Sequence, residues 1–412
     1  MTIYNTVFYL ILGILIFNYL LERVLDLLNT SKISVKLPAE LEGIYDDEKY
    51  KKQQEYKRVN DRFSMLTSTF SFGLILTMLF LGGFGYVNSF ALKFTTNPIL
   101  VALLFFGIIM FASDLINMPF SLYDIFVIEE RFGFNKMTSK TFIFDKLKGW
   151  GISMVIGGGL LALIVWFYQL TTDYFWLYAW IAVSAFMIFM SMFYSTLIVP
   201  LFNKQTPLEE GDLRDAIEAF SNKVGFKLDN IFVIDGSKRS TKANAYFSGL
   251  GSKKRIVLYD TLINDLTTDE IVAVLAHEIG HYKKKHTLTG ILTGIVQTGI
   301  TLYIFSLMVR NPALSHALGA EKPAFQLGLI AFGILYSPIS LVIGLGMNIF
   351  SRKNEYAADL YAKEHYRAEP LITALKKLTS KNLSNLTPHP AFVFFHYSHP
   401  PLLERVRALN KS

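Results

Sequence analysis

The stretch Ala276-His277-Glu278-Ile279-Gly280-His281 contains the only His-Glu-x-x-His pattern in the chain. On an α-helix, side chains four positions apart share one face, so His277 and His281 can present two imidazole nitrogens to one Zn²⁺ ion. Glu278 would lie beside them as a general base toward water. An exposed helix can carry the same letters by chance, and a catalytic zinc centre needs a third protein ligand. The pattern therefore predicts a zinc site only if another part of the chain completes it.

The residues before this motif favour a helix over about 268–284. Thr267 and Glu270 fit a capping box, in which each side chain bonds the backbone of the other residue. Apolar residues then recur at helical spacing up to the motif. We expect this helix to continue through the lysines at 283–285 into a membrane span.

The composition is typical of a polytopic membrane protein. The 412 residues are 52% hydrophobic and only 18% charged, with a mean hydropathy of +0.35, which excludes an ordinary soluble domain. The formal net charge of +7 is interpreted as membrane-flanking Lys and Arg rather than as a nucleic-acid patch. The apolar run from Ile3 has no basic residues before it and no small-residue cleavage site after it. It therefore predicts a first transmembrane helix and not a signal peptide.

Seven stretches are long and apolar enough to cross a bilayer, which requires about 20 residues. Lys and Arg gather in alternate connections: residues 201–286 contain thirteen, whereas residues 310–324 contain two. By the positive-inside rule, this alternation places the N-terminus outside and the C-terminus in the cytoplasm. Residues 40–63 form a charged loop before the second span. The predicted spans are 3–28, 64–90, 99–120, 148–170, 174–199, 287–309 and 325–350.

The long insert between the fifth and sixth spans predicts a small cytoplasmic α/β unit that ends with the zinc-motif helix. We expect a helix at 208–224, strands at Asn230–Asp235 and Arg255–Tyr259, and a short edge strand at Asn244–Gly249. The chain then divides into 1–200 with spans one to five and their cytoplasmic loops, 201–286, 287–350 with spans six and seven, and 351–412, a cytoplasmic tail that completes the zinc site.

A second pair of side chains at helical spacing follows the seventh span. Glu355 and Asp359 are four residues apart, so both carboxylates leave one face of a helix. Two spans separate this pair from the zinc motif and return the chain to the same membrane face. Because the chain has no cysteine, Glu355 is the candidate third ligand, and Asp359 a candidate acceptor for the N–H of a ligand imidazole. The alternative is an exposed acidic pair.

Several stretches occur in an order that is specific when they are taken together. They are Tyr123–Glu129 with Phe132–Lys136, Asn244–Gly249, Arg255–Leu262, His277–His281, Glu355–Asp359, and Ser398–Pro401 followed by Glu404 and Arg405. In this order the chain resembles, over nearly its whole length, the type I CAAX prenyl proteases, which are integral-membrane zinc endopeptidases of the gluzincin kind. The larger eukaryotic members carry a hydrophilic insertion that we do not find here, which suggests a prokaryotic member.

The resemblance implies a fold and further site residues. The fold is mainly α, with seven transmembrane helices in a chambered α-barrel and a cytoplasmic gluzincin-like α/β zinc domain. His399 is expected near the zinc, where it stabilises the reacting carbonyl, and Arg405 is expected to support the site. Asn244, Ala245 and Tyr246 are expected to form an edge strand that aligns the substrate.

The predicted activity is zinc-dependent hydrolysis of peptide bonds near the cytoplasmic membrane face. The expected partners are the bilayer and a peptide or protein substrate, either prenylated or membrane-associated, and no nucleic acid. In a prokaryotic inner membrane the role would be processing or quality control. One alternative is an intramembrane metalloprotease of the site-2 kind, which the polar residues 264–270 and the lysines at 283–285 disfavour. The other is a transporter or channel with a structural or incidental zinc motif.

The remaining histidines receive no catalytic role. We expect His286 and His365 to be surface or interface residues, and His316 to lie on the far side of the membrane. His389 and His396 are in the same tail as His399, where a structural role and a place beside the site both remain open.

Overall fold

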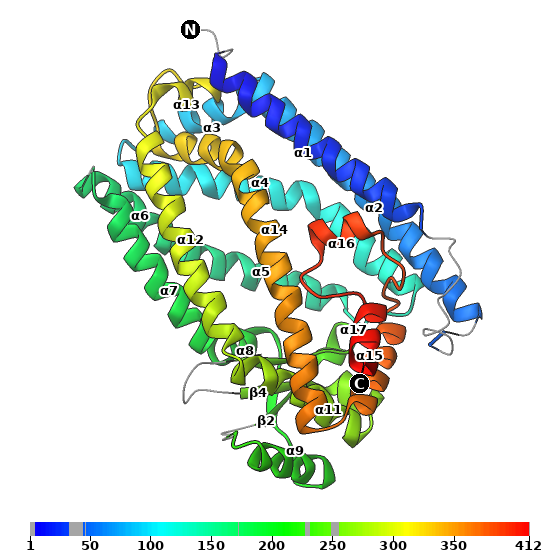
Figure 1. Cartoon of the computed structure of the whole chain (residues 1–412). Coiled ribbons are helices and arrows are strands. Elements are labelled where there is room, and N and C mark those ends of the chain that lie inside the picture. The colour runs from blue at the N-terminus through cyan, green and yellow to red at the C-terminus, as the bar shows by residue number, and fades with distance from the viewer. Residues whose placement is uncertain are drawn as a thin grey trace.

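The computed structural model describes residues 5–32, 44–45, 47–171, 173–226, 231–248 and 255–411. Figure 1 shows a mainly helical molecule in which long helices run between two ends. The first turns of the chain's first helix and α13 (Pro312–Ala317) lie at one end, and the small sheet and the last helix of the chain lie at the other.

Seven helical segments of the described chain are long and apolar enough to cross a membrane, and each overlaps a predicted span. At most 28% of the residues in any span's most apolar window are buried, which fits a wall one helix thick, as a chambered barrel requires. The segments are α1 (Thr6–Thr30), α2 (Asp47–Phe80), α4 (Pro98–Tyr123) with η2 (Asp124–Glu129), α5 (Ser139–Ile152) with η3 (Ser153–Gly157) and α6 (Gly158–Leu170), α7 (Phe175–Leu197) with α8 (Val199–Phe202), α12 (His286–Met308) and α14 (Phe325–His365).

The second span differs most from its predicted boundaries. Residues 47–63 belong to α2 and do not form the expected loop. Two acidic residues in the first turn favour this charged helix, and Lys57 and Asp61 pair at 2.6 Å along it. At the other end the span stops at Phe80, because Gly82 adopts a left-handed φ of 64° before α3 (Gly83–Leu92) begins.

A four-stranded sheet forms the base of the soluble part, with strand order β1-β2-β4-β3. The strands are β1 (Gln205–Pro207), β2 (Ile231–Ile234), β3 (Ala245–Ser248) and β4 (Arg255–Tyr259). The β2–β4 pair is parallel, and the other two pairs are antiparallel. The prediction of an edge strand after Asn244 is confirmed, since β3 is at the end of the strand order and pairs with β4 alone among the described strands. Strand β1 was not predicted, because three residues ending in proline are too short to show an alternating pattern.

Helix α11 (Thr268–Lys283) carries the His-Glu-x-x-His motif and lies in the soluble core. Its predicted capping box is present: the Thr267 amide donates to Glu270 at 2.7 Å, and the Glu270 amide donates to the Thr267 hydroxyl. Ile271, Leu275 and Ile279 are fully or almost fully buried. Around α11 lie α9 (Asp212–Lys223), α10 (Asp260–Asp265), α15 (Ala368–Lys381) and α17 (Leu402–Asn410), with η4 (Gly236–Lys238) and α16 (Pro390–His396) in the connections.

Helices α11 and α14 cross in close contact at Gly280. A Cβ atom on Gly280 would lie 3.1 Å from the Ala358 Cα and 3.1 Å from the Tyr361 Cβ. Helix α14 continues without a break from the membrane into the soluble part, so its last turns lie directly against the motif helix. Since α11 itself is outside the seven apolar segments, the structure argues against a metal motif inside a membrane span.

We expect Gly280→Val to lower the stability of the protein, because its branched side chain must push α14 away. Such overpacking costs about 1–3 kcal/mol. The midpoint of thermal unfolding in detergent should fall relative to the native protein, and Gly280→Ala should have a smaller effect. Gly333→Val is the matched control, because a Cβ on Gly333 of α14 meets no atom within 4 Å. Equal midpoints for Gly280→Val and Gly333→Val would contradict the close crossing.

Candidate metal centre

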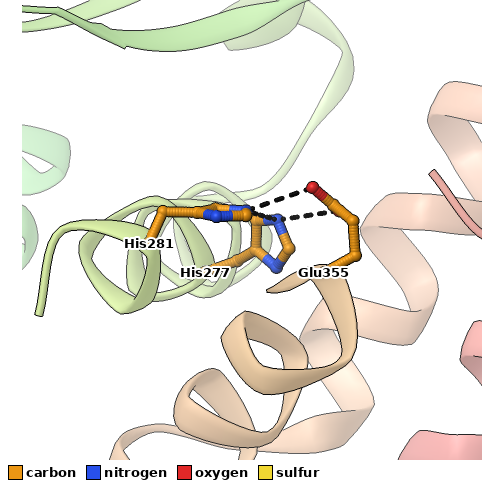
Figure 2. Close-up of side chains that lie close together, drawn as sticks. All are labelled: His277, His281 and Glu355. Atoms are coloured by element: carbon orange, nitrogen blue, oxygen red, sulfur yellow. Dashed lines mark hydrogen bonds and ion pairs between the residues drawn. The ribbon is translucent and has the colours of Figure 1, made fainter. Parts of the chain in front are cut away.

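Three side chains from two helices converge on one point (Figure 2). His277 and His281 leave one face of α11, and their Nε2 atoms are 3.1 Å apart. Glu355 reaches them from α14, with Oε1 3.2 Å from His281 Nε2 and Oε2 3.4 Å from His277 Nε2. The i, i+4 spacing within α11 and the continuous course of α14 produce this convergence.

The donor set fits a divalent cation. Glu355 is only 4% exposed, and its Oε2 atom has no hydrogen-bond partner among the described residues. A buried carboxylate oxygen without a partner is costly unless another group compensates it. A cation held by two imidazole nitrogens and this carboxylate would do so, and such a set is typical of zinc enzymes.

A buried ion pair orients the first imidazole. Asp359 Oδ1 lies 2.9 Å from His277 Nδ1, on the side of the ring opposite the convergence point. Arg405 of α17 donates two hydrogen bonds to the Asp359 carboxylate, at 2.8 and 2.6 Å. With a proton on Nδ1 for Asp359, His277 keeps the Nε2 lone pair free for a metal. Asp359 and Arg405 are thus placed to set the tautomer of this imidazole.

The charges around His277 also affect proton binding. Burial disfavours the imidazolium, but hydrogen bonds to Asp359 and Glu355 outweigh burial and raise the pKa of His277 to about 9. Because only a neutral imidazole binds a metal, a cation must displace this proton. Metal affinity is therefore expected to fall as the pH is lowered.

A cavity of about 620 Å³ lies in front of the convergence point. Nine of the ten predicted site residues line it, whereas Asp359 does not. His399 enters from the segment before α17, with Nε2 3.2 Å from Glu355 Oε1 and a side chain that is 64% exposed. Glu278 is half-buried in the cavity wall. The nine residues are Asn244, Ala245, Tyr246, His277, Glu278, His281, Glu355, His399 and Arg405.

His286 also lines this cavity, and the prediction of a surface or interface residue missed it. Its Nδ1 atom is 2.9 Å from Nδ1 of His281. The expected continuous helix is wrong here: α11 ends at Lys283, Lys285 adopts a left-handed φ of 59°, and α12 starts at His286. This turn brings His286 back toward the motif. The sequence shows that His286 is close to the motif. It does not show the change of backbone direction, because the residue with the left-handed φ is Lys285 and not a glycine.

The other histidines lie away from the cavity lining. His365 stacks on Tyr361, and His389 accepts a hydrogen bond from the backbone at the start of α16. His396 pairs with Glu22 of α1 at 3.3 Å. A structural role for His389 and His396 accounts for these contacts.

Comparisons with known proteins cover nearly the whole chain. A family model described as "CAAX prenyl protease N-terminal, five membrane helices" matches residues 27–204, and the model of peptidase family M48 matches residues 207–412. CAAX prenyl protease 1 of Saccharomyces cerevisiae is 35% identical, with 97% of this chain and 94% of the yeast protein covered. The Arabidopsis thaliana homolog is 36% identical over 97% of this chain and 96% of its own length.

A human relative and a solved structure agree with these matches. The human homolog is 31% identical, with 92% of this chain and 90% of the human protein covered. The crystal structure of S. mikatae Ste24p matches with a TM-score of 0.93 and 35% identity, over 99% of each chain. None of these matches points to a transporter or channel. The named yeast, plant and human relatives are eukaryotic and match over almost their whole length, so they give no support to the expected prokaryotic origin.

We expect His286→Leu to weaken metal binding, because His281 then loses the acceptor for its Nδ1–H. Loss of such an outer partner typically reduces metal affinity about 10- to 100-fold. His286→Asn should retain much of the affinity, since its Oδ1 can accept near the position of the imidazole Nδ1. The measurement is competition for zinc between the purified protein and a chelator. His316→Leu, at the opposite end of the molecule, is the control, and equal affinities for all variants would contradict the contact.

Proposed function

Because the chain belongs to peptidase family M48 and is an integral-membrane metalloendopeptidase, we propose that His277, His281 and Glu355 hold Zn²⁺ for peptide-bond hydrolysis. The observation that carries this proposal is their convergence within 3.4 Å of one another, with a buried carboxylate oxygen that makes no hydrogen bond among the described residues. When bound, zinc supplies the Lewis acidity that hydrolysis of an amide needs at neutral pH.

Glu278 is proposed as the general base. Its carboxylate is in the cavity wall and follows the first ligand directly in the chain. It removes a proton from the attacking water and delivers it to the nitrogen of the leaving amine. The half-buried setting keeps this carboxylate within reach of a substrate in the cavity.

His399 is proposed to stabilise the negative charge that develops on the carbonyl oxygen. Its Nδ1 lies 3.0 Å from the Ser398 hydroxyl, and its Nε2 lies on the side of Glu355. When Ser398 donates to Nδ1, the proton resides on Nε2, which then becomes a donor in the cavity. Asp359 and Arg405 act behind the centre by holding the His277 imidazole.

The free edge of β3 is proposed to bind the substrate as an added strand. Asn244, Ala245 and Tyr246 line the cavity, and β3 pairs with β4 on its other side. An extended peptide at this edge would gain backbone hydrogen bonds with little dependence on its side chains. Its scissile bond would then lie in the same 620 Å³ cavity as the metal ligands.

The proposed substrate is a prenylated peptide with a CAAX C-terminus. The yeast relative is named CAAX prenyl protease 1, and the alignment covers nearly all of both chains. The cavity lining contains apolar side chains as well as the polar ones described above, which suits a substrate with both characters. The apolar lining residues include Leu262, Val274, Met347, Phe350, Leu371, Leu375 and Leu378.

The active site is proposed to face the cytoplasm, with the N-terminus on the other side of the membrane. The basic connections of the chain, including residues 201–286 and the tail from 351, belong to the end that holds the sheet and the metal centre. By the positive-inside rule this end is cytoplasmic. The proposed domains are the sequence-based ones, with the zinc centre completed by the tail.

We expect Glu278→Gln to abolish turnover and to keep the metal. Loss of a general base typically lowers the rate about 10²- to 10⁴-fold, whereas the three metal ligands are unchanged. Cleavage of a fluorogenic peptide and metal content by mass spectrometry are the measurements. Glu355→Gln is the matched variant, since the same change at a ligand should lose both zinc and activity. The proposal would be wrong if Glu278→Gln cleaved the peptide at the native rate, or if the purified native protein contained no zinc.

We expect a farnesylated CAAX peptide to be cleaved with a higher kcat/KM than its unprenylated counterpart, because the farnesyl chain buries apolar area in the cavity. At about 25 cal/mol per Å², even partial burial gives at least about a tenfold gain. The two peptides should be compared on the same purified protein. Equal values of kcat/KM for the two peptides would contradict a preference for the prenyl group, although the protein would still be a peptidase.

A further inference from the structure

The Phe132–Lys136 stretch has no place in the mechanism above, yet it pairs with the chain just before the substrate strand. The Lys136 amide donates to the Arg239 carbonyl, and the Thr241 amide donates to the Phe134 carbonyl, both at 3.0 Å. Asn135 and Ser240 form an isolated antiparallel bridge between these two bonds. A loop at the end of a membrane helix is therefore paired, backbone to backbone, with the segment that leads into β3.

A charged contact extends this pairing. The Lys242 ammonium lies 2.7 Å from Glu129 Oε2 and donates to the Tyr56 hydroxyl at 3.0 Å. Tyr56 in turn donates to the other oxygen of Glu129. The ammonium also lies 4.6 Å from the centre of the Phe134 ring, close enough for a cation–π interaction. Lys242 is thus held by three groups, one from α2 and two from the region that follows α4.

Glu129 is placed by an unusual piece of helix. It is the last residue of η2, the π-helical turn that ends the span begun by α4. Short π-helical turns within α-helices occur frequently at functional sites, where they shift the direction of the side chains that follow. Glu129 is mostly buried, with a side-chain exposure of 17%. A mostly buried carboxylate that faces one lysine is a specific contact rather than a loose surface pair.

Lys242 directly precedes the cavity lining, which begins at Ala243. The backbone of both residues is also held: the Lys242 carbonyl accepts from the Thr261 hydroxyl at 3.1 Å, and the Ala243 amide donates to Asn382 at 3.3 Å. From Asn244 on, the backbone hydrogen bonds that the structure describes for this strand join it to β4. The Lys242 side chain, through its contacts with Glu129 and Tyr56, therefore fixes the segment before this edge to the membrane helices.

We propose that Glu129 and Lys242 are a positioning pair that sets the register of the β3 edge relative to the metal centre. This inference rests on the proposed function, in which β3 binds the peptide. A slip of one residue in strand pairing turns every side chain to the opposite face, so a substrate strand needs a fixed start. The pair anchors that start to the cytoplasmic ends of two membrane helices, α2 and α4 with its η2 extension. A looser anchor weakens peptide binding and leaves the metal ligands in place.

The experiment is a double-mutant cycle on the full-length protein purified in detergent. Glu129→Gln, Lys242→Met and the double variant are compared for kcat, KM and zinc content with the same fluorogenic peptide. Each single variant should raise KM about tenfold, which is 1.4 kcal/mol, with kcat within about twofold of the native value. The double variant should be no worse than the worse single variant, because both changes remove one interaction. Zinc content should stay unchanged.

Binding is measured separately from turnover in the Glu278→Gln background, where the peptide Kd should rise by the same factor as KM. Lys242→Arg keeps the charge and should recover most of the affinity. Lys238→Met is the matched control, since Lys238 is exposed four residues upstream and should leave KM unchanged.

Three results would overturn the positioning pair: an unchanged KM in both single variants, additive effects in the double variant, or loss of zinc together with activity. The last result would indicate a general structural role. A failure of the proposed function gives a different result from a failure of the positioning pair. In that case the Glu278→Gln protein, the parent in which binding is measured, would still cleave peptide. If that parent is inactive and Glu129→Gln leaves the peptide Kd unchanged, only the positioning pair fails.

Discussion

The close crossing of α11 and α14 is the contact on which the site depends. Gly280 belongs to the turn of α11 that carries His277 and His281, and it faces the backbone of α14. A larger side chain at this position would meet Ala358 and Tyr361. At this separation a glutamate side chain from α14 reaches both imidazoles. The helices bury apolar side chains on either side of the crossing, so the core that stabilises the soluble part is also the support of the metal centre.

The membrane part and the soluble part share their helices. Helix α14 runs from the apolar region to Glu355 and beyond, and α12 enters the membrane directly from His286 beside the centre. The η2 turn connects a third span to the segment before β3. The position of the site relative to the membrane bundle is therefore fixed by helices rather than by long loops.

Charge around the centre is high for a buried site, and each charge has a partner. Asp359 is almost fully buried, and two hydrogen bonds from Arg405 compensate it. Burial of an ion pair often gives no net stability, since desolvation offsets the attraction. The arrangement is better explained by the orientation that it gives to His277. The cavity face of the same imidazole remains available, because its hydrogen-bonding partner is on the opposite side.

The local sequence determined the parts of this protein that depend on local interactions. Hydropathy predicted seven spans, the capping box predicted the start of α11, and the i, i+4 spacing predicted which side chains share a face. The resemblance to a family, rather than a local pattern, suggested His399, Arg405 and Asn244–Tyr246, and the roles of these residues are proposals. The charged first half of α2 and the three-residue β1 were not predicted, because their helical and strand patterns are weak within a short window.

Only the tertiary structure decided which distant segments meet. The backbone turns at Lys285, a non-glycine residue with a left-handed φ, and this turn places His286 next to His281. The contact between Glu129 and Lys242 joins residues more than a hundred positions apart. Periodicity reports the neighbours of a residue along its own helix or strand. The approach of separate elements depends on the packing of the whole core, and no short window of sequence contains that information.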